Sequence, residues 1–361
     1  MFTRRFRFRT AAVGLATALV VPLVPAATAT AAPAPAARAD RAAGWLAGEL
    51  QNGRIRNLEF DFVDWGLTLD TYIGLAAANA RPAAQRQIVR AVSRNVRSYV
   101  TFDRTTYAGP VAKLLYVRRV HGVPATIESE RYDLRSRLSR MVRDSGPQRG
   151  RVSDTGPGAD TSNTIGQSFA VLAFARSGRT PRTTVGYLLR QQCRAGFFRL
   201  DMTARGCRRD NSPADVDATA FGVQALLGAR RDGVDVPSRS IRRAGAWLAR
   251  AQQPSGAFGG VGPTSGPNSN STGVAAQALQ AVNRNAAARD ARRWVAGLQL
   301  LPGNTAGTPA RRDVGAIAYD RAALRAARGN GITRTTRDQW RRSTPQALLA
   351  FAPRPLATLT S

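Results

Sequence analysis

Carboxylate and amide side chains recur in one setting along this chain, at the start of Ala- and Leu-rich stretches. Such side chains can hold a ligand or transfer a proton, and aromatic residues on the neighbouring segments would add apolar contacts. The same residue types also cap helices, because their oxygens accept hydrogen bonds from free backbone N–H groups. Ligand contact and capping therefore both stay open. The polar candidates are Asp70, Asn163, Asp217, Asn270 and Asp313, and the aromatic ones are Trp65, Phe198 and Phe258.

The residue inventory limits metal chemistry. The 361 residues include one histidine, His121, and two cysteines, Cys193 and Cys207. This excludes a Cys/His zinc site, a di-metal centre and an iron–sulfur cluster, and we expect no metal and no cofactor. His121 stands beside Gly122 and is interpreted as a surface or capping residue. The cysteines lack the C-x-x-C spacing of a reactive thiol pair, so a structural disulfide is predicted.

The N-terminus has the pattern of a secretory signal peptide. Four arginines within residues 1–9 precede an uncharged apolar run over 11–25, and an A-x-A cleavage site ends at Ala31. Twin-arginine export is the alternative to the general route. We predict a signal peptide over 1–31, an Ala/Pro-rich linker over 32–39, a repeat domain over 40–354 and a tail over 355–361. The protein is expected to be secreted or associated with the cell wall, without a later transmembrane segment.

Charge is the most unusual property of the composition. There are 53 Lys and Arg residues against 23 Asp and Glu residues, a formal net charge of +30, and Lys113 is the only lysine. Loss of the four signal-peptide arginines would leave +26. This charge favours anionic partners such as cell-envelope polymers. The abundance of Arg and Ala also indicates a compositional bias of the genome. No specific nucleic-acid binding is expected outside the cell.

The elements that carry these residues repeat along the chain. One half of the unit is an aromatic residue, a helical stretch, then Gln-x3-Gly, as at Gln192 and Gly196; Gln252-Gly256 and Gln299-Gly303 follow the same pattern. A glycine at this point is typical of a left-handed helix end. Apolar residues recur at three and four positions, which predicts helices.

The second half is a polar cluster that opens an Ala/Leu-rich helix. Thr219 and Thr272 mark two copies in the same register; Thr164, the stretch 67–70 and Asp313 mark weaker ones. We predict about six helical hairpins in an all-α fold. Ala-rich inner helices favour closure into an α/α toroid, whose inner helices would begin around one mouth of a central cavity; an open superhelix is the alternative.

These motifs carry a family resemblance. The Gln-x3-Gly-x-Phe and Asp-Ala-Thr-Ala-x4-Ala-Leu strings resemble the repeat shared by squalene/terpenoid cyclases and protein prenyltransferase β-subunits. The segments 64–70 and 193–217 resemble secreted actinobacterial proteins with prenyltransferase/squalene-oxidase repeats. The resemblance covers roughly residues 40–330 and implies the α/α toroid.

The resemblance also implies two kinds of chemistry. The Asp-x-Asp-Asp acid of class II terpene cyclases aligns with residues 215–218, which makes Asp217 the candidate general acid beside Asp215; Ala218 breaks the motif. The zinc ligands of the prenyltransferases have no counterpart. We therefore expect a non-catalytic protein that binds an anionic envelope polymer or a small hydrophobic ligand. A terpenoid cyclase/prenyltransferase-like enzyme that uses Asp217 is the alternative.

Overall fold

The computed structural model describes residues 34–207 and 213–360. The predicted signal peptide and the first two residues of the predicted linker lie outside them. Helix α1 already begins at Pro35, within the predicted linker. Helix α1 spans Pro35–Gly48 and lies on the outside of the fold. The other outer helices are α3 (Pro82–Ser93), α4 (Val96–Val100), α6 (Leu134–Arg140), α8 (Arg182–Arg190), α10 (Ser238–Ala251) and α12 (Asn285–Ala296).

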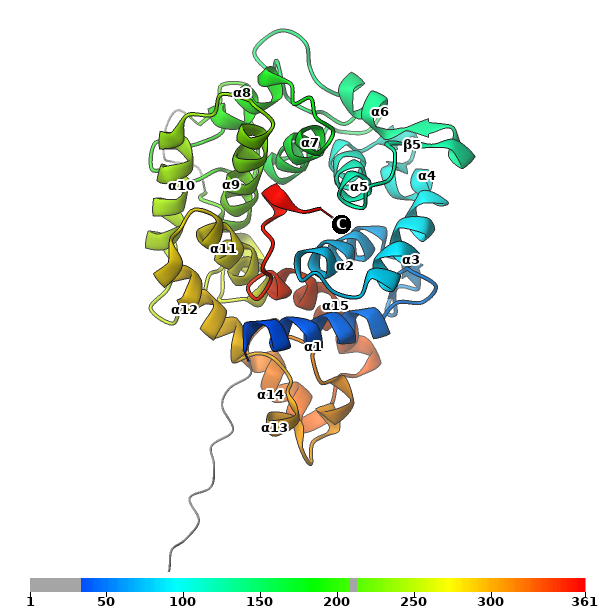
Figure 1. Cartoon of the computed structure of the whole chain (residues 1–361), viewed down its shortest axis with the longest axis vertical. Helices are drawn as coiled ribbons and strands as arrows, with labels where there is room; N and C mark the ends of the chain where they lie inside the picture. The colour runs from blue at the N-terminus through cyan, green and yellow to red at the C-terminus, as the bar shows by residue number, and fades with distance from the viewer. Residues whose placement is uncertain (1–33, 208–212, 361) are drawn as a thin grey trace, which may run out of the picture. The chain divides into compact units, whose positions relative to one another are not determined.

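Within the described residues, six inner helices form a closed ring, seen end-on in Figure 1. Each packs against the next in chain order, and the last one packs against the first, so the ring is closed. The predicted toroid is therefore confirmed, and the open superhelix is wrong. The inner helices are α2 (Trp65–Ala77), α5 (Ala108–Val120), α7 (Thr164–Arg176), α9 (Val216–Arg231), α11 (Ser269–Ala281) and α15 (Arg334–Leu348).

Short elements complete the connections. The described residues contain three two-stranded antiparallel hairpins, of which the first two lead from an outer to an inner helix and the third leads from inner helix α5 to outer helix α6. They are β1–β2 (Arg56–Asn57, Phe62–Val63), β3–β4 (Thr101–Phe102, Thr105–Thr106) and β5–β6 (Thr126–Ile127, Tyr132–Asp133). The other short helices are η1 (Glu128–Glu130), η2 (Gly262–Thr264), α13 (Pro302–Thr305), η3 (Pro309–Asp313), α14 (Arg321–Asn330) and η4 (Leu356–Thr358).

The two layers differ in how much of each helix is buried. Inner helix α9 buries 12 of its 16 residues, whereas outer helix α12 buries four of 12, at helical spacing. Small residues let the inner helices approach closely. A Cβ at Gly273 would lie 2.1 Å from the Gln346 carbonyl oxygen, and one at Gly166 would lie 3.3 Å from the Gly109 Cα. Glycine is therefore a packing requirement at position 273, and at position 166 it allows a close approach of two helices.

A threonine hydroxyl ties each of several inner helices to the loop before it. Thr219 Oγ1 accepts from the Phe198 N–H at 2.9 Å and donates to the Asp215 carbonyl at 2.6 Å. Thr272 makes the equivalent bonds. In α7 the corresponding position is Gln167, whose Oε1 accepts from Val152 N–H at 2.9 Å. Thr164, predicted as the anchor, is instead the first residue of the helix.

The last unit departs from the predicted spacing. Gly196 and Gly256 have φ values of +111° and +89°, and a Cβ there would lie about 2.5 Å from a backbone carbonyl of the next outer helix. Gly315, with φ of +108° against the Arg41 carbonyl, takes this place in the last unit, and Gln299 donates to its carbonyl at 3.2 Å. The prediction of Gly303 is wrong because α13 and η3 are inserted. Asp313 consequently lies in η3 and opens no inner helix.

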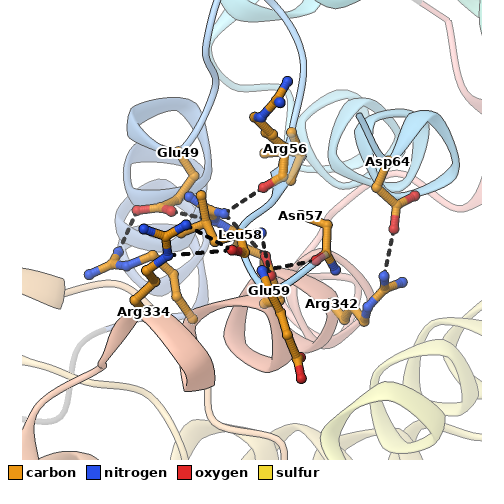
Figure 2. A network of polar contacts seen from close by, with 12 residues as sticks. Glu49, Arg56, Asn57, Leu58, Glu59, Asp64, Arg334 and Arg342 are labelled. Carbon is orange, nitrogen blue, oxygen red and sulfur yellow. Dashed lines mark hydrogen bonds and ion pairs between the residues drawn. The ribbon is translucent and has the colours of Figure 1, made fainter. Parts of the chain in front are cut away.

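A buried charge network joins α1 and the β1–β2 hairpin to α15 (Figure 2). Glu49 accepts from Arg337 at 2.7 Å and from Arg341 at 2.6 Å. Arg341 also donates to Asp338 at 3.1 Å, and Asp338 accepts from the Leu58 N–H at 2.7 Å. Partners on both sides satisfy these buried charges, which would otherwise be costly. The network fixes the point where the ring closes.

Two other predictions concern covalent and membrane structure. Cys193 and Cys207 form a disulfide with a Cα–Cα distance of 4.8 Å, as predicted. Within residues 34–207 and 213–360, no helix is long and apolar enough to cross a membrane.

Candidate functional site

Two candidate side chains, Asp217 and Asn270, lie in the first turns of α9 and α11 and do not cap these helices. Asp215 caps α9, accepting from the Ala218 N–H at 2.6 Å, and Asn268 caps α11, accepting from the Ser271 N–H at 2.8 Å. Asp217 and Asn270 stand two residues further on. The capping interpretation of both residues is therefore wrong, and their side chains instead contact the neighbouring inner helix.

The carboxyl group of Asp217 is only half satisfied. Its Oδ2 accepts from Ser271 Oγ on α11 at 3.2 Å, while its Oδ1 is buried and has no hydrogen-bond partner within residues 34–207 and 213–360. Burial, and then the negative charge of Asp215, raise the pKa of Asp217 to about 7, partly opposed by the Ser271 hydrogen bond. At neutral pH this carboxyl group can therefore either hold or release a proton.

Asn270 presents a second free acceptor beside it. Its Nδ2 donates to Gln346 Oε1 at 2.8 Å and to the Arg342 carbonyl at 3.1 Å, both on α15. Because both partners are acceptors, the amide orientation is fixed. Its Oδ1 is buried and has no hydrogen-bond partner in the part of the chain that the structure describes. Equivalent positions of adjacent inner helices thus carry two unpaired acceptors.

Across the ring, the unique lysine forms an ion pair. Lys113 of α5 pairs with Asp70 of α2, donates to the Gly66 carbonyl at 3.2 Å and lies over the ring of Phe169 at 5.7 Å. Phe169 in turn packs on Phe221, with ring centroids 5.3 Å apart. The side chains of Lys113 and Asp70 are 15% and 26% exposed. The pair is accessible, but much of it is desolvated.

We define the mouth of the ring as the group of polar side chains in the first two turns of α2, α5, α9 and α11 and beside them on α15; all of them except the buried Ser271 are at least partly exposed. Arg342 completes it by pairing with Asp64, the N-cap of α2, at 2.6 Å. Sequence reasoning missed Lys113, Arg342, Gln346 and Ser271; the uniqueness of Lys113 was a usable signal. The mouth residues are Asp70, Lys113, Asp217, Asn270, Ser271, Arg342 and Gln346.

The other predicted rim residues have other contacts. Asn163 caps α7 by accepting from the Gly166 N–H at 3.0 Å. Trp65 is buried as the first residue of α2, and Phe198 and Phe258 are fully buried in the core. Asp313 accepts from Arg337 at 3.0 Å and from Trp45 Nε1 at 3.1 Å, within the charge network that joins α1 to α15.

Metal-binding side chains do not gather in the part of the chain that the structure describes. Over residues 34–207 and 213–360, no group of three His, Cys, Asp or Glu side chains could hold a metal ion. His121 is the C-cap residue of α5, and its Nδ1 lies 3.2 Å from Tyr72 Oη. Burial, followed by the nearby arginines, lowers the pKa of His121.

Comparison with known proteins identifies the fold. No family model matches the sequence, and no curated protein matches it. Solved structures do match. The chain folds as an α/α toroid. A protein from Actinoplanes has 18% identity and a TM-score of 0.53, covering 88% of this chain and 99% of that one.

Two enzymes share the fold at still lower identity. Type II terpene cyclase MstE from Scytonema, in complex with geranylgeranyl dihydroxybenzoate, has 14% identity and a TM-score of 0.57, covering 88% of this chain and 97% of the cyclase. Unsaturated glucuronyl hydrolase from Bacillus sp. GL1 has 13% identity and a TM-score of 0.54, covering 87% and 96%. The predicted similarity to terpenoid cyclases holds for the fold.

Proposed function

We propose that the mouth of the toroid binds a ligand rich in hydrogen-bond donors, such as a sugar unit of an acidic envelope polysaccharide. One observation carries this proposal: on adjacent helices, Asp217 and Asn270 present two buried acceptor oxygens that have no hydrogen-bond partner among the described residues. An unsatisfied buried polar group costs about 1–3 kcal/mol. A ligand hydroxyl that donates to each oxygen would recover much of that cost.

The rest of the mouth and the surface charge support the same class of ligand. The Lys113–Asp70 pair offers both a donor and an acceptor to a polar ligand. The net charge of +30 would attract a polyanion and raise its local concentration. The Bacillus sp. GL1 enzyme, which has the same fold, acts in the degradation of glycosaminoglycan.

Calorimetric titration with two defined oligosaccharides tests the proposal. Trigalacturonate represents an acidic ligand and cellotriose a neutral one. Wild-type protein is expected to bind at least one of them, and Asn270→Ala to weaken that binding about tenfold through loss of a buried hydrogen bond. Asp235→Asn, a change at an exposed residue, serves as the control. Undiminished binding by Asn270→Ala, or no binding of either sugar, would contradict the proposal.

A second candidate function is catalysis with Asp217 as general acid. The pKa of about 7 and the burial of this carboxyl group support it, because a general acid works best with a pKa near the operating pH. The test is incubation with squalene or geranylgeranyl diphosphate, followed by product analysis. This candidate predicts turnover that Asp217→Asn abolishes. Absence of turnover by the wild-type protein would leave the binding function alone.

We also propose that the protein is exported. The predicted signal peptide over 1–31 supports this, and the Cys193–Cys207 disulfide fits an oxidising compartment. N-terminal sequencing of the exported protein tests it, with Ala32 as the expected first residue. A chain that keeps Met1 and remains with the cells would contradict it.

A further inference from the structure

The C-terminal segment of the chain lies inside the ring of inner helices. After α15 the chain turns back, and residues 353–360 pass through the centre of the ring (red in Figure 1). We call these residues the tail segment. Leu356 and Leu359 are at most 1% exposed, and Ala357 is 5% exposed. The short helix η4 packs against α9.

Four different inner helices hold the tail segment by its backbone. Tyr116 Oη of α5 donates to the Leu356 carbonyl at 2.8 Å, and the Ala357 N–H donates to Gln224 Oε1 of α9 at 3.1 Å. Gln277 Nε2 of α11 donates to the Arg354 carbonyl at 3.0 Å. The Arg354 N–H donates to the carbonyl of the last residue of α2 at 3.3 Å.

These contacts are of the kind that a protein makes with a bound peptide. Main-chain hydrogen bonds supply affinity, while the two buried leucines, three residues apart, supply specificity. Tyr116, Gln224 and Gln277 are 0%, 2% and 3% exposed, so their polar groups would lack these partners if the segment left. These three side chains therefore give this part of the ring polar groups that can bind the N–H and C=O groups of a peptide.

The segment is also placed so that it can leave. It follows the last inner helix, α15, so no helix of the ring has to pass through the ring when the segment leaves. A cavity of about 470 Å³ lies where the segment enters the ring, and Phe351, Ala352 and Pro353 form part of its wall. Prolines at 353 and 355 flank the entering turn and keep it out of the α15 helix.

We propose that the part of the ring lined by Tyr116, Gln224 and Gln277 is a peptide-binding site and that the tail segment is its releasable occupant. A peptide with a Leu-x-x-Leu spacing that forms one short helical turn, as η4 does, can replace it. This site is separate from the proposed sugar site at the mouth. Tyr116 connects the two, because its ring packs on Phe169 of the mouth side at 5.9 Å.

Binding of the tail sequence added in trans tests the proposal. The probe is a fluorescein-labelled peptide of residues 353–361, measured by fluorescence anisotropy against the full chain. The wild-type protein is expected to bind it poorly, because its own segment competes at an effective concentration in the mM range. The full-length double variant Leu356→Asp with Leu359→Asp should bind at least about tenfold more tightly. A probe with both leucines replaced by Asp is the control and should not bind.

Two results would overturn the proposal. One is a folded double variant that binds the probe no better than the wild-type protein does. The other comes from hydrogen exchange on the wild-type chain, which remains decisive if the variant does not fold. A releasable segment predicts that backbone amides of residues 356–360 exchange at least about tenfold faster than those of 219–226 in α9. Exchange of both at the same slow rate would show that the segment opens only with global unfolding.

Discussion

Replacement of Asp217 by Asn should change the pH dependence of stability. In the folded protein burial raises the pKa of Asp217 from 3.8 to about 7. The stabilisation linked to the protonated carboxyl group is therefore fully present below pH 3.8 and is lost as the pH rises through about 7. A difference of about 3 pH units corresponds to about 4 kcal/mol. Asn cannot ionise, so the Asp217→Asn variant avoids this loss.

Urea unfolding at pH 4, 6 and 8.5 measures the effect. We expect the free energies of unfolding of variant and wild type to be similar at pH 4. At pH 8.5 the variant should be more stable by about 2–4 kcal/mol, the lower end reflecting the partial exposure of the residue. Other titrating groups cancel in the difference between the two proteins. Asp235→Asn, at an exposed position, should show no such trend.

The result that would refute this reasoning is a difference that does not grow with pH. Equal stability of the two proteins at pH 8.5 would mean that the Asp217 carboxylate is well solvated or paired. In that case neither a ligand acceptor of this kind nor a general acid near neutral pH would exist at the mouth.

Three further predictions concern the scaffold. Gly256→Ala should lower the free energy of unfolding by at least about 2 kcal/mol because the residue has a positive φ and faces a backbone carbonyl, whereas Gly303→Ala, in open space, should change it by less than about 0.5 kcal/mol; similar losses for both would contradict the argument. Thr272→Val should cost about 1–3 kcal/mol in urea unfolding, because a buried N–H loses its acceptor; no loss would mean that water replaces the hydroxyl. Reduction of the Cys193–Cys207 disulfide should cost about 3 kcal/mol, and an unchanged urea midpoint would argue against this entropy-based value.

Much of the ring could be predicted from the sequence because each helix carries its signals within its own segment. Helical spacing of apolar residues, glycines at helix ends and polar clusters at helix starts each appear within one segment. The disulfide followed from the inventory of two cysteines. The prediction for the last unit was wrong because the inserted α13 and η3 separate Gln299 from Gly315, while Gly303 has the expected spacing from Gln299.

The candidate site was harder to predict for a geometric reason. Asp215 and Asp217 are both plausible caps, and only the backbone conformation decides which one accepts the N–H bonds. Asn268 and Asn270 pose the same problem. Lys113, Arg342 and Gln346 come from weakly repeated units and meet at the mouth only because the ring closes. The tail segment has no helical pattern, and its burial depends on the helices that surround it.

Both proposed functions of the mouth depend on the partly unsatisfied carboxyl group of Asp217. A carboxyl ¹³C NMR titration, with the resonance assigned by its absence in Asp217→Asn, measures the pKa of this group directly. We expect a pKa of about 7 in the free protein and a lower pKa when trigalacturonate or cellotriose donates a hydroxyl to the carboxylate. A pKa near 3.8 that neither sugar changes would contradict this expectation.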